Sequence, residues 1–348
     1  MGATLALMSK PISEGCADVQ ENLRVSGTPL RRRACHDRLM NGRLMLLDTA
    51  SLYFRAFHGL PDTLKSPDGT PINAARGLCD FIARLVTDYQ PTHLVACWDD
   101  DWRPQWRVDL IPSYKQHRVQ RVVADGPDIE ETPDLLVPQI PLIRRMLTTF
   151  GVTIVGAEHH EADDVIGSLA SQSSMPVDVV TGDRDLFQLI DDDSGVRVIY
   201  TARGMSKLDV LTESAVLEKY GVTAGQYADF AALRGDTSDG LPGVAGIGDK
   251  TAASLLGTFG SLDAIIAAAS DPDAEISQTF RAKIRGAADY LAVAPTVVGV
   301  VRTLDLPQND PQIRPLSPDA LGEARQLAAD LGLGGAADRA LRALGNEV

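Results

Sequence analysis

The sequence predicts an α/β fold with a mainly parallel central sheet flanked by helices, followed by a smaller helical module. Short apolar runs alternate with helical patterns between residues 43 and 220, as expected for strands joined by crossover helices. Several of the runs lead into acidic residues. After Gly221 the pattern is helical only. We therefore expect an α/β core over residues 43–220 and a helical module over residues 221–303.

The composition indicates a globular protein of the reducing cytoplasm. The chain has 348 residues, of which 44% are hydrophobic and 23% charged, and no apolar run is long enough to cross a membrane. Cysteines stand at four positions without metal-site or disulfide-scaffold spacing: Cys16, Cys35, Cys79 and Cys97. The net charge of -14 argues against indiscriminate binding to polyanions, unless many acids are neutralised by bound cations.

The first elements follow an extension. Residues 1–42 are polar, include three consecutive arginines and lack a secretory apolar segment, so we expect them to be disordered. Residues 43–48 predict a buried strand that ends in Asp48, and residues 49–58 a short helix. Thr70 and Pro71 predict the amino cap and first turn of the next helix.

Four further strands are expected, and acids follow three of them. The strands cover residues 93–99, 152–155, 177–185 and 196–200. The acids are Asp99 at the end of the first of these, Glu161, Asp163 and Asp164 after the next, and Asp183 and Asp185 at the end of the third. Because the carboxyl ends of parallel strands meet at one edge, these side chains and Asp48 should share that edge.

Crowded carboxylates predict a metal centre. Glu161, Asp163 and Asp164 repel one another if they converge, so they must raise their pKa values or bind a cation. Carboxylates without nearby cysteine or paired histidine suit Mg2+ or Mn2+, and two such ions can assist in-line displacement at phosphorus. Helix capping explains any single cluster. Several clusters at strand ends favour the metal centre.

A basic and aromatic stretch follows the second strand. Arg107, Lys115 and Arg118 are candidate phosphate ligands, and Tyr114 offers a stacking face. The alternative is a solvated loop with aromatic anchors in the core, a role that suits Trp102 and Trp106.

A glycine-rich hairpin over residues 235–248 joins two predicted helices, and Lys250 and Thr251 open the second helix. Asp249 stands where a phosphate-binding loop needs lysine, which excludes an ATPase loop. Such a hairpin can instead offer backbone amides to a DNA phosphate, or it can be a simple tight turn. A linker over residues 304–318 and a helix near residues 320–331 are expected to close the chain.

Together these motifs resemble the 5' nuclease family, which comprises flap endonucleases and the 5'-3' exonuclease domain of bacterial DNA polymerase I. The resemblance runs from about residue 43 to residue 300, in family order. It rests on Leu46-Leu47-Asp48 with Phe54-Arg55-Ala56-Phe57-His58, Trp98-Asp99, Trp106-Arg107 with Tyr114-Lys115-Gln116-His117-Arg118, Glu161-Ala162-Asp163-Asp164, Thr181-Gly182-Asp183-Arg184-Asp185, and Gly235-Asp236-Thr237-Ser238-Asp239 with Gly243 to Thr251.

The resemblance implies a PIN-like core with a basic arch over residues 101–135 and a helix-three-turn-helix DNA-binding module. It implies one metal held by Asp48, Asp99, Glu161 and Asp163 with Asp164 close by, and another held by Asp183, Asp185, Asp236 and Asp239. It implies a catalytic group formed by Lys115, Arg118, Arg107 and Tyr114, and DNA contacts from Arg55, Gly243, Gly246, Gly248, Lys250 and Thr251.

The expected activity is Mg2+- or Mn2+-dependent hydrolysis of DNA with a 5' flap, nick or 5' end, in replication and repair. The resemblance implies two or more divalent ions, a K+ at the hairpin, water as nucleophile and no covalent intermediate. We expect a monomer at the nucleoid, acting alone or with a DNA polymerase. Two alternatives stay open at this point: a DNA-structure-binding protein that has lost catalysis, and a PIN-type metal-dependent ribonuclease.

Overall fold

The structure, a computed structural model, describes residues 42–123, 126–307 and 309–348. The expected disordered extension over residues 1–42 therefore lies, apart from Gly42, outside the described residues.

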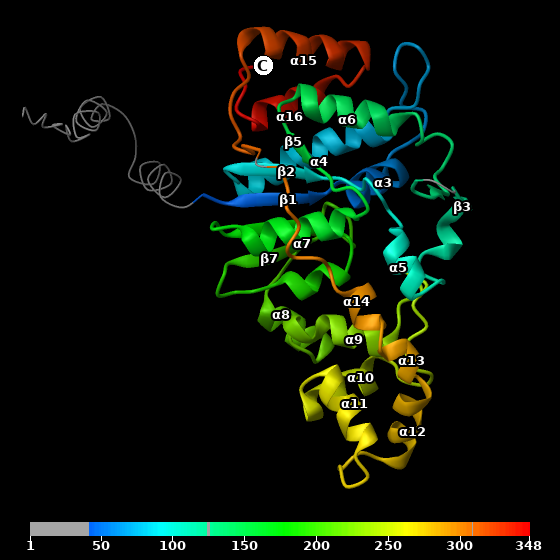
Figure 1. Cartoon of the computed structure of the whole chain (residues 1–348). Helices are drawn as coiled ribbons and strands as arrows, with labels where there is room; N and C mark the ends of the chain where they lie inside the picture. The colour runs from blue at the N-terminus through cyan, green and yellow to red at the C-terminus, as the bar shows by residue number, and fades with distance from the viewer. Residues whose placement is uncertain (1–41, 124–125, 308) are drawn as a thin grey trace, which may run out of the picture. The chain divides into compact units, whose positions relative to one another are not determined.

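A six-stranded sheet in the order β5-β2-β1-β6-β7-β8 forms the centre of the α/β part (Figure 1). The strands are β1 (Leu44–Asp48), β2 (His93–Cys97), β5 (Thr153–Val155), β6 (Val177–Thr181), β7 (Val196–Tyr200) and β8 (Asp209–Leu211). All neighbours pair in parallel except β8, which runs antiparallel to β7. The mainly parallel sheet is thus confirmed. The edge strand β8 was not predicted, because it begins with Asp209 and shows no apolar run like the one that marks β5.

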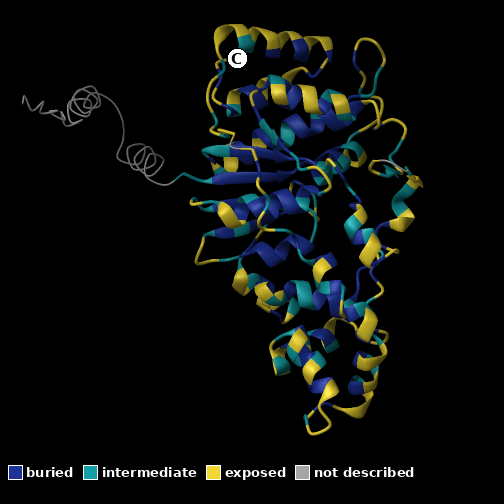
Figure 2. Cartoon of the chain, viewed as in Figure 1, coloured by how far each residue is buried: buried dark blue, intermediate teal, exposed yellow. Residues whose placement is uncertain are grey.

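The first strand shows why the sheet is covered on both faces. All five residues of β1 are buried (Figure 2). Leu44 and Leu46 join the hydrophobic cluster on one face, whereas Met45 and Leu47 join the cluster on the other, as the two-residue period of a strand requires. A run that is apolar at every position therefore predicts a strand between two layers of helices.

One layer contains α3 (Thr49–Gly59), α4 (Asn73–Tyr89) and α6 (Gln139–Thr149), and the other contains α7 (Ala162–Gln172). The predicted cap of α4 is wrong: the helix begins at Asn73, and Thr70 and Pro71 lie in the preceding turn. The buried Gln139 side chain instead accepts the backbone N–H of Ala74 at 2.9 Å. This cap comes from another helix, so local sequence could not reveal it.

The arch segment contains α5 (Gln105–Leu110), the 3-10 turn η1 (Gln116–Arg118) and two short antiparallel strands, β3 (Val119–Arg121) and β4 (Ile129–Glu130). The short strands were not predicted. Further 3-10 turns are η2 (Asp185–Leu189) and η3 (Ala224–Gln226).

Helix α8 (Glu213–Tyr220) follows β8, and the helical module contains α9 (Tyr227–Arg234), α10 (Asp249–Phe259), α11 (Leu262–Ser270), α12 (Gln278–Gly286), α13 (Ala288–Leu291) and α14 (Ala294–Val298). The glycine hairpin joins α9 to α10, as predicted. Gly243 has φ +64°, and a Cβ there would lie 2.5 Å from the Arg234 carbonyl oxygen, so only glycine fits. In the described part of the chain no single helix meets the length and hydropathy of a membrane span; α10 and α11 do so only as a pair, bent by 81°.

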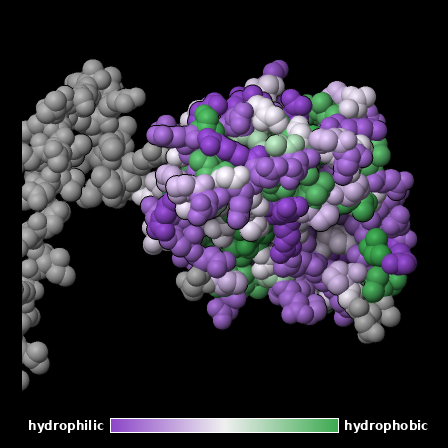
Figure 3. All heavy atoms as spheres, turned by 90° about the horizontal axis from the view of Figure 1, so that it is seen from above, coloured by the Kyte–Doolittle hydropathy of each residue, from purple (hydrophilic) through white to green (hydrophobic). Residues whose placement is uncertain are grey.

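The carboxyl-terminal segment returns to the α/β part. The Leu94 N–H donates to the Pro311 carbonyl and the Ile313 N–H to the Thr92 carbonyl, both at 2.9 Å. Helix α15 (Pro318–Asp330) contacts α6, and α16 (Gly335–Ala343) contacts α4. The expectation that one helix closes the chain is wrong, because α16, whose buried face consists of Ala336, Ala337, Ala340 and Leu341, follows α15. Seen from above, this end of the molecule is mainly hydrophilic with separate hydrophobic patches (Figure 3).

Candidate metal centre

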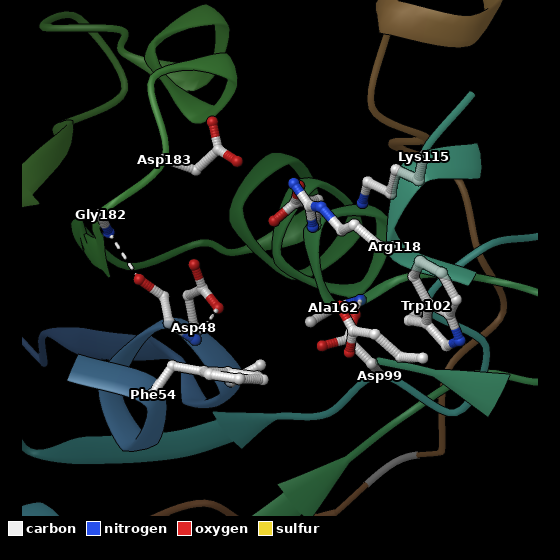
Figure 4. A pocket seen from close by; sticks show the side chains of 13 residues that line it. Asp48, Phe54, Asp99, Trp102, Lys115, Arg118, Ala162, Gly182 and Asp183 are labelled. Atoms are coloured by element: carbon white, nitrogen blue, oxygen red, sulfur yellow. Dashed lines mark hydrogen bonds between the residues drawn. The ribbon is translucent and has the colours of Figure 1, made fainter. Parts of the chain in front are cut away.

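The carboxyl edge of the sheet borders a cavity of about 240 Å³ that is lined by four of the predicted acids, each from a separate element. Asp48 is the last residue of β1, Asp99 follows β2, Asp163 lies in the first turn of α7 and Asp183 follows β6. Lys115 and Arg118 approach the same cavity from the arch (Figure 4). The structure therefore brings four of the nine predicted ligands and two predicted phosphate contacts to one cavity.

Hydrogen bonds fix two of these acids at helix starts. Asp48 accepts the N–H of Ser51 at 3.1 Å as the cap of α3, and its other oxygen accepts the Thr181 hydroxyl at 2.7 Å. Asp99 accepts the N–H of Ala162 at 2.8 Å. Capping and metal binding are thus compatible, because the caps orient carboxylates that still line the cavity.

Burial and mutual repulsion destabilise the ionised form of the carboxylates that line the cavity. Burial raises the pKa of Asp48 to about 7. The Thr181 hydrogen bond lowers this pKa, and repulsion from Asp99 offsets part of that lowering. Burial, together with Asp183 and Asp48, raises the pKa of Asp163 well above its usual value. A cation between these groups would remove the penalty.

Asp185 and Asp239 extend the acidic region. Both are buried, and burial raises both pKa values, with Asp183 adding repulsion to each. The Oδ1 atom of Asp185 is buried without a hydrogen-bond partner. Buried oxygens of this kind need a donor or a cation, and carboxylate oxygens are the ligands that Mg2+ and Mn2+ prefer. The donor set therefore fits hard divalent cations.

The carboxylate side chains nevertheless do not adopt the arrangement needed to coordinate a metal ion. Within residues 42–123, 126–307 and 309–348, no group of three or more His, Cys, Asp or Glu side chains is arranged to hold one ion. Glu161 is part of the reason, since its carboxylate accepts from Lys115 Nζ, from Arg107 at 2.6 Å and from the Tyr114 hydroxyl at 2.7 Å. Coordination by Glu161 would replace the Lys115 contact.

Asp164 faces away from the cavity. Its two oxygens accept the Arg107 guanidinium at 2.7 and 2.9 Å, and Oδ1 also accepts the Val301 N–H at 2.9 Å. Successive residues of a helix point about 100° apart, so Asp163 and Asp164 cannot face the same side. The structure places Asp164 in the framework behind the cavity.

Two predicted DNA contacts are buried instead. Arg107 is 2% exposed and also donates to the Val297 carbonyl, and Tyr114 is 3% exposed with its hydroxyl on Glu161. The phosphate role for Arg107 and the stacking role for Tyr114 are therefore wrong for this conformation. Trp106 pairs with His160 and Arg107, in keeping with the anchor alternative.

Asp236 lies in a different environment. It accepts Arg234 at 3.0 Å and Arg184 at 3.5 Å, and also the Ser238 hydroxyl and N–H. Burial works to raise its pKa, but the Ser238 bonds and the guanidinium groups outweigh burial and lower the pKa. Asp236 borders a second cavity of about 350 Å³ together with these arginines.

The two arch cations are held by the loop that contains Asp239. The Lys115 N–H donates to the Asp239 carbonyl at 2.9 Å, and Arg118 donates to the Ser238 carbonyl at 2.9 Å and to Asp239 at 3.2 Å. A Cβ at Gly240 would lie 2.1 Å from the Ser113 carbonyl oxygen, so glycine permits this contact. The loop after α9 thereby positions Lys115 and Arg118 at the cavity.

The predicted DNA-binding residues of the hairpin are accessible. Gly246, Gly248 and Lys250 are exposed, whereas Gly243 and Thr251 are half-buried. Lys283 donates to the Gly246 carbonyl at 2.8 Å. Arg55 of α3 is half-buried near Gly182, and its Nε atom lacks a hydrogen-bond partner.

The cavity lining includes Glu130, Phe54 and Trp102, which were not predicted as site residues. Phe54 lies in a quoted motif without an assigned role, Trp102 looked like a core anchor, and Glu130 stands in an acidic stretch without a strand signal. Burial raises the pKa of Glu130, which Arg118 and Lys115 partly offset.

Comparisons with known proteins agree with this geometry. Residues 43–221 match the family "5'-3' exonuclease, N-terminal resolvase-like domain", and residues 222–320 match "5'-3' exonuclease, C-terminal SAM fold". A 5'-3' exonuclease of Streptomyces coelicolor is 55% identical over 86% of this chain and 99% of its own length. DNA polymerase I of Mycobacterium bovis is 43% identical over 64% of this chain but only 24% of its own length.

Solved structures share the fold. The T5 5'-exonuclease with bound divalent zinc has a TM-score of 0.57 at 18% identity, covering 87% of this chain and 98% of its own. Flap endonuclease-1 of Methanococcus jannaschii has a TM-score of 0.54 at 15% identity, covering 88% and 94%. Since two family matches span the α/β core and the helical module, and a close relative matches over nearly its whole length, this chain belongs to the 5'-3' exonuclease family.

Proposed function

We propose that the protein is a metal-dependent, structure-specific 5' nuclease that degrades DNA from 5' ends and removes 5' flaps in replication and repair. The central observation is the cavity in which Asp48, Asp99, Asp163 and Asp183 face Lys115 and Arg118. Acids that bind cations and cations that bind a phosphate are both needed to hold a phosphodiester for hydrolysis.

The acids divide into two groups around Asp183. Asp48, Asp99 and Asp163 would hold one divalent ion, joined by Glu161 once Lys115 leaves it. Asp183, Asp185 and Asp239 would hold a second, with Asp236 released from its arginines. Mg2+ or Mn2+ bound there would activate water and stabilise charge developing on the phosphate oxygens. Both ions prefer the oxygen ligands that this site supplies.

Basic side chains and backbone amides of the protein would bind the DNA phosphates. Lys115 and Arg118 would bind the phosphate to be cut and stabilise its added negative charge. The exposed amides at Gly246 and Gly248, with Lys250, would bind a phosphate of the duplex without reading its sequence. Arg55 of α3, which lies near Gly182, would bind another phosphate.

We extend the proposal to the surroundings of the enzyme. A K+ ion at the hairpin carbonyls would support duplex binding, with the Gly246 carbonyl shared with Lys283. A monomer would suffice, because both the acids and the arch cations come from one chain. A DNA substrate would support a location in the cytoplasm at the nucleoid, where a DNA polymerase would extend the strand that the protein trims.

A set of labelled substrates tests this function. Purified protein is incubated with a 5'-flap duplex, a 3'-flap duplex and a 5'-flap duplex whose flap is RNA, each with Mn2+ or with EDTA. We expect Mn2+-dependent cleavage of the 5'-flap DNA at the flap junction and little cleavage of the 3' flap.

Two other outcomes point elsewhere. Faster cleavage of the RNA flap than of the DNA flap would support a ribonuclease. Tight binding of the 5'-flap duplex in a gel shift, without cleavage when Mn2+ is added, would support a binding protein and contradict the proposed enzyme.

A further inference from the structure

Trp102 is the one tryptophan of the described chain whose ring has no aromatic or cationic partner. Trp98 lies 6.1 Å from the Tyr53 ring and beneath Arg144. Trp106 pairs with His160 and Arg107. Trp102 has neither kind of contact, and it lines the acidic cavity beside Asp99 (Figure 4). Its ring is thus an apolar surface in a cavity of charged groups.

The ring is also held in place from behind. Trp102 Nε1 donates to the Asp128 carbonyl at 2.6 Å, which satisfies its only polar atom. Asp128 in turn pairs with Arg103 at 2.6 Å and accepts the Val123 N–H at 3.1 Å. Arg103 donates to the Tyr114 carbonyl at 2.6 Å, next to Lys115. The same network therefore orients Trp102 and the backbone of the phosphate-binding lysine.

A second aromatic residue lines the cavity from α3. Phe54 stacks on Tyr53 at a centroid distance of 5.3 Å, and it borders the cavity near Asp48. The acids between the two rings repel phosphate, whereas a nucleobase is neutral and has a π-face that stacks on any aromatic ring. The cavity thus offers cations for a phosphate and rings for a base.

We propose that Trp102 stacks on the base of the 5'-strand nucleotide next to the phosphate being cut, and so positions that phosphate against Lys115 and Arg118. The contact is independent of base identity, because every base presents a π-face. It also requires that this nucleotide be unpaired, since a base within a duplex is covered on both sides. Trp102 would therefore help to select strands whose end is unpaired at the cleavage site. This inference rests on the proposed nuclease function.

The test is a cycle that combines two changes, Trp102→Ala in the protein and removal of the base at that nucleotide of a 5'-flap substrate. Single-turnover cleavage with Mn2+ gives the half-saturating enzyme concentration and the maximal rate for each combination. With the intact base, we expect W102A to raise the half-saturating concentration by about 5-fold to 100-fold, the loss of one base–aromatic stack. With the abasic substrate, wild type and W102A should differ by less than about 2-fold.

Two controls separate stacking from damage to the arch. Trp102→Phe keeps a π-face but loses the Nε1 donor, so it should stay within about 5-fold of wild type on the intact substrate. Val122→Ala changes an arch residue that is 74% exposed and outside the cavity lining, and it should match wild type on both substrates. A 2-aminopurine at the chosen nucleotide should lose fluorescence on binding to wild type and keep it with W102A.

Equal loss from W102A on intact and abasic substrates, or equal 2-aminopurine quenching by both proteins, would overturn the stacking role. If the wild type cleaves the substrate in that experiment, the proposed nuclease function still holds. If the wild type does not cleave, the nuclease proposal fails, and the 2-aminopurine signal still decides whether Trp102 contacts a base.

Discussion

Among single residues, Arg107 shows how far the sequence could predict the site. Its type and its position before Tyr114 suggested a phosphate contact, but the side chain is buried between Glu161 and Asp164. Which side of a helix a charged residue faces depends on what packs there, and Asp164 was misjudged for the same reason. Acids at strand ends, such as Asp48, were predictable because topology fixes where they lie.

Removal of the Arg107 side chain should lower the unfolding free energy of the protein. Arg107→Leu leaves the buried Asp164 carboxylate without its cation and Glu161 with Lys115 alone. Breaking a buried pair in this way typically costs about 3–5 kcal/mol of unfolding free energy. Arg84→Ala, which breaks an exposed pair with Asp88, is the control and should cost at most about 1 kcal/mol. Urea unfolding of both variants checks this; equal midpoints for Arg107→Leu and wild type would contradict the buried-pair role.

The acids also predict a pH dependence of the metal-free protein. The pKa of Asp48 is about 7 when folded, above its usual value of 3.8, so the folded state binds protons more tightly. Stability should therefore rise as pH falls from 8 to 6, because protonation relieves the repulsion. Asp48→Asn should weaken this rise. Thermal melts in EDTA at both pH values measure it, and a lower melting temperature of wild type at pH 6 than at pH 8 would refute it.

At the scale of elements, the apolar strands and long helices were predictable, whereas elements defined by tertiary contact were not. Strand β1 is apolar at every position, so its burial between two layers followed from its sequence. Strand β8 and the arch strands β3 and β4 each contain a charged residue and no apolar run, and α16 packs against α4, which lies far away in sequence. Their positions depend on β7, on each other and on α4, which no local pattern contains.

Helix α16 should contribute to the stability of the α/β part. Leu341 is fully buried in the same hydrophobic cluster as the buried face of α4. Leu341→Ala should lower the unfolding free energy by about 2–5 kcal/mol. Glu323→Ala on the exposed side of α15 is the matched control and should change it by less than about 0.5 kcal/mol. If both variants unfold at the same denaturant concentration, α16 is not part of the cooperative unit.

For the whole molecule, the structure combines a net charge of -14 with a cavity whose acids repel one another. Binding of cations to the folded state alone must then stabilise that state. Residues far apart in sequence, from Asp48 to Asp239, reach this region only after folding. Folding, metal binding and cleavage should therefore depend on one another.

The most direct test of that account is a Mn2+ titration followed in parallel by the melting temperature and by the cleavage rate of a 5'-flap duplex. For the wild type we predict that both rise over the same range of Mn2+ concentration, and that Asp48→Asn and Asp183→Asn lose cleavage while the metal-free proteins stay folded. Cleavage in EDTA as fast as in Mn2+, or saturated thermal stabilisation by Mn2+ without any cleavage, would contradict the metal-dependent nuclease.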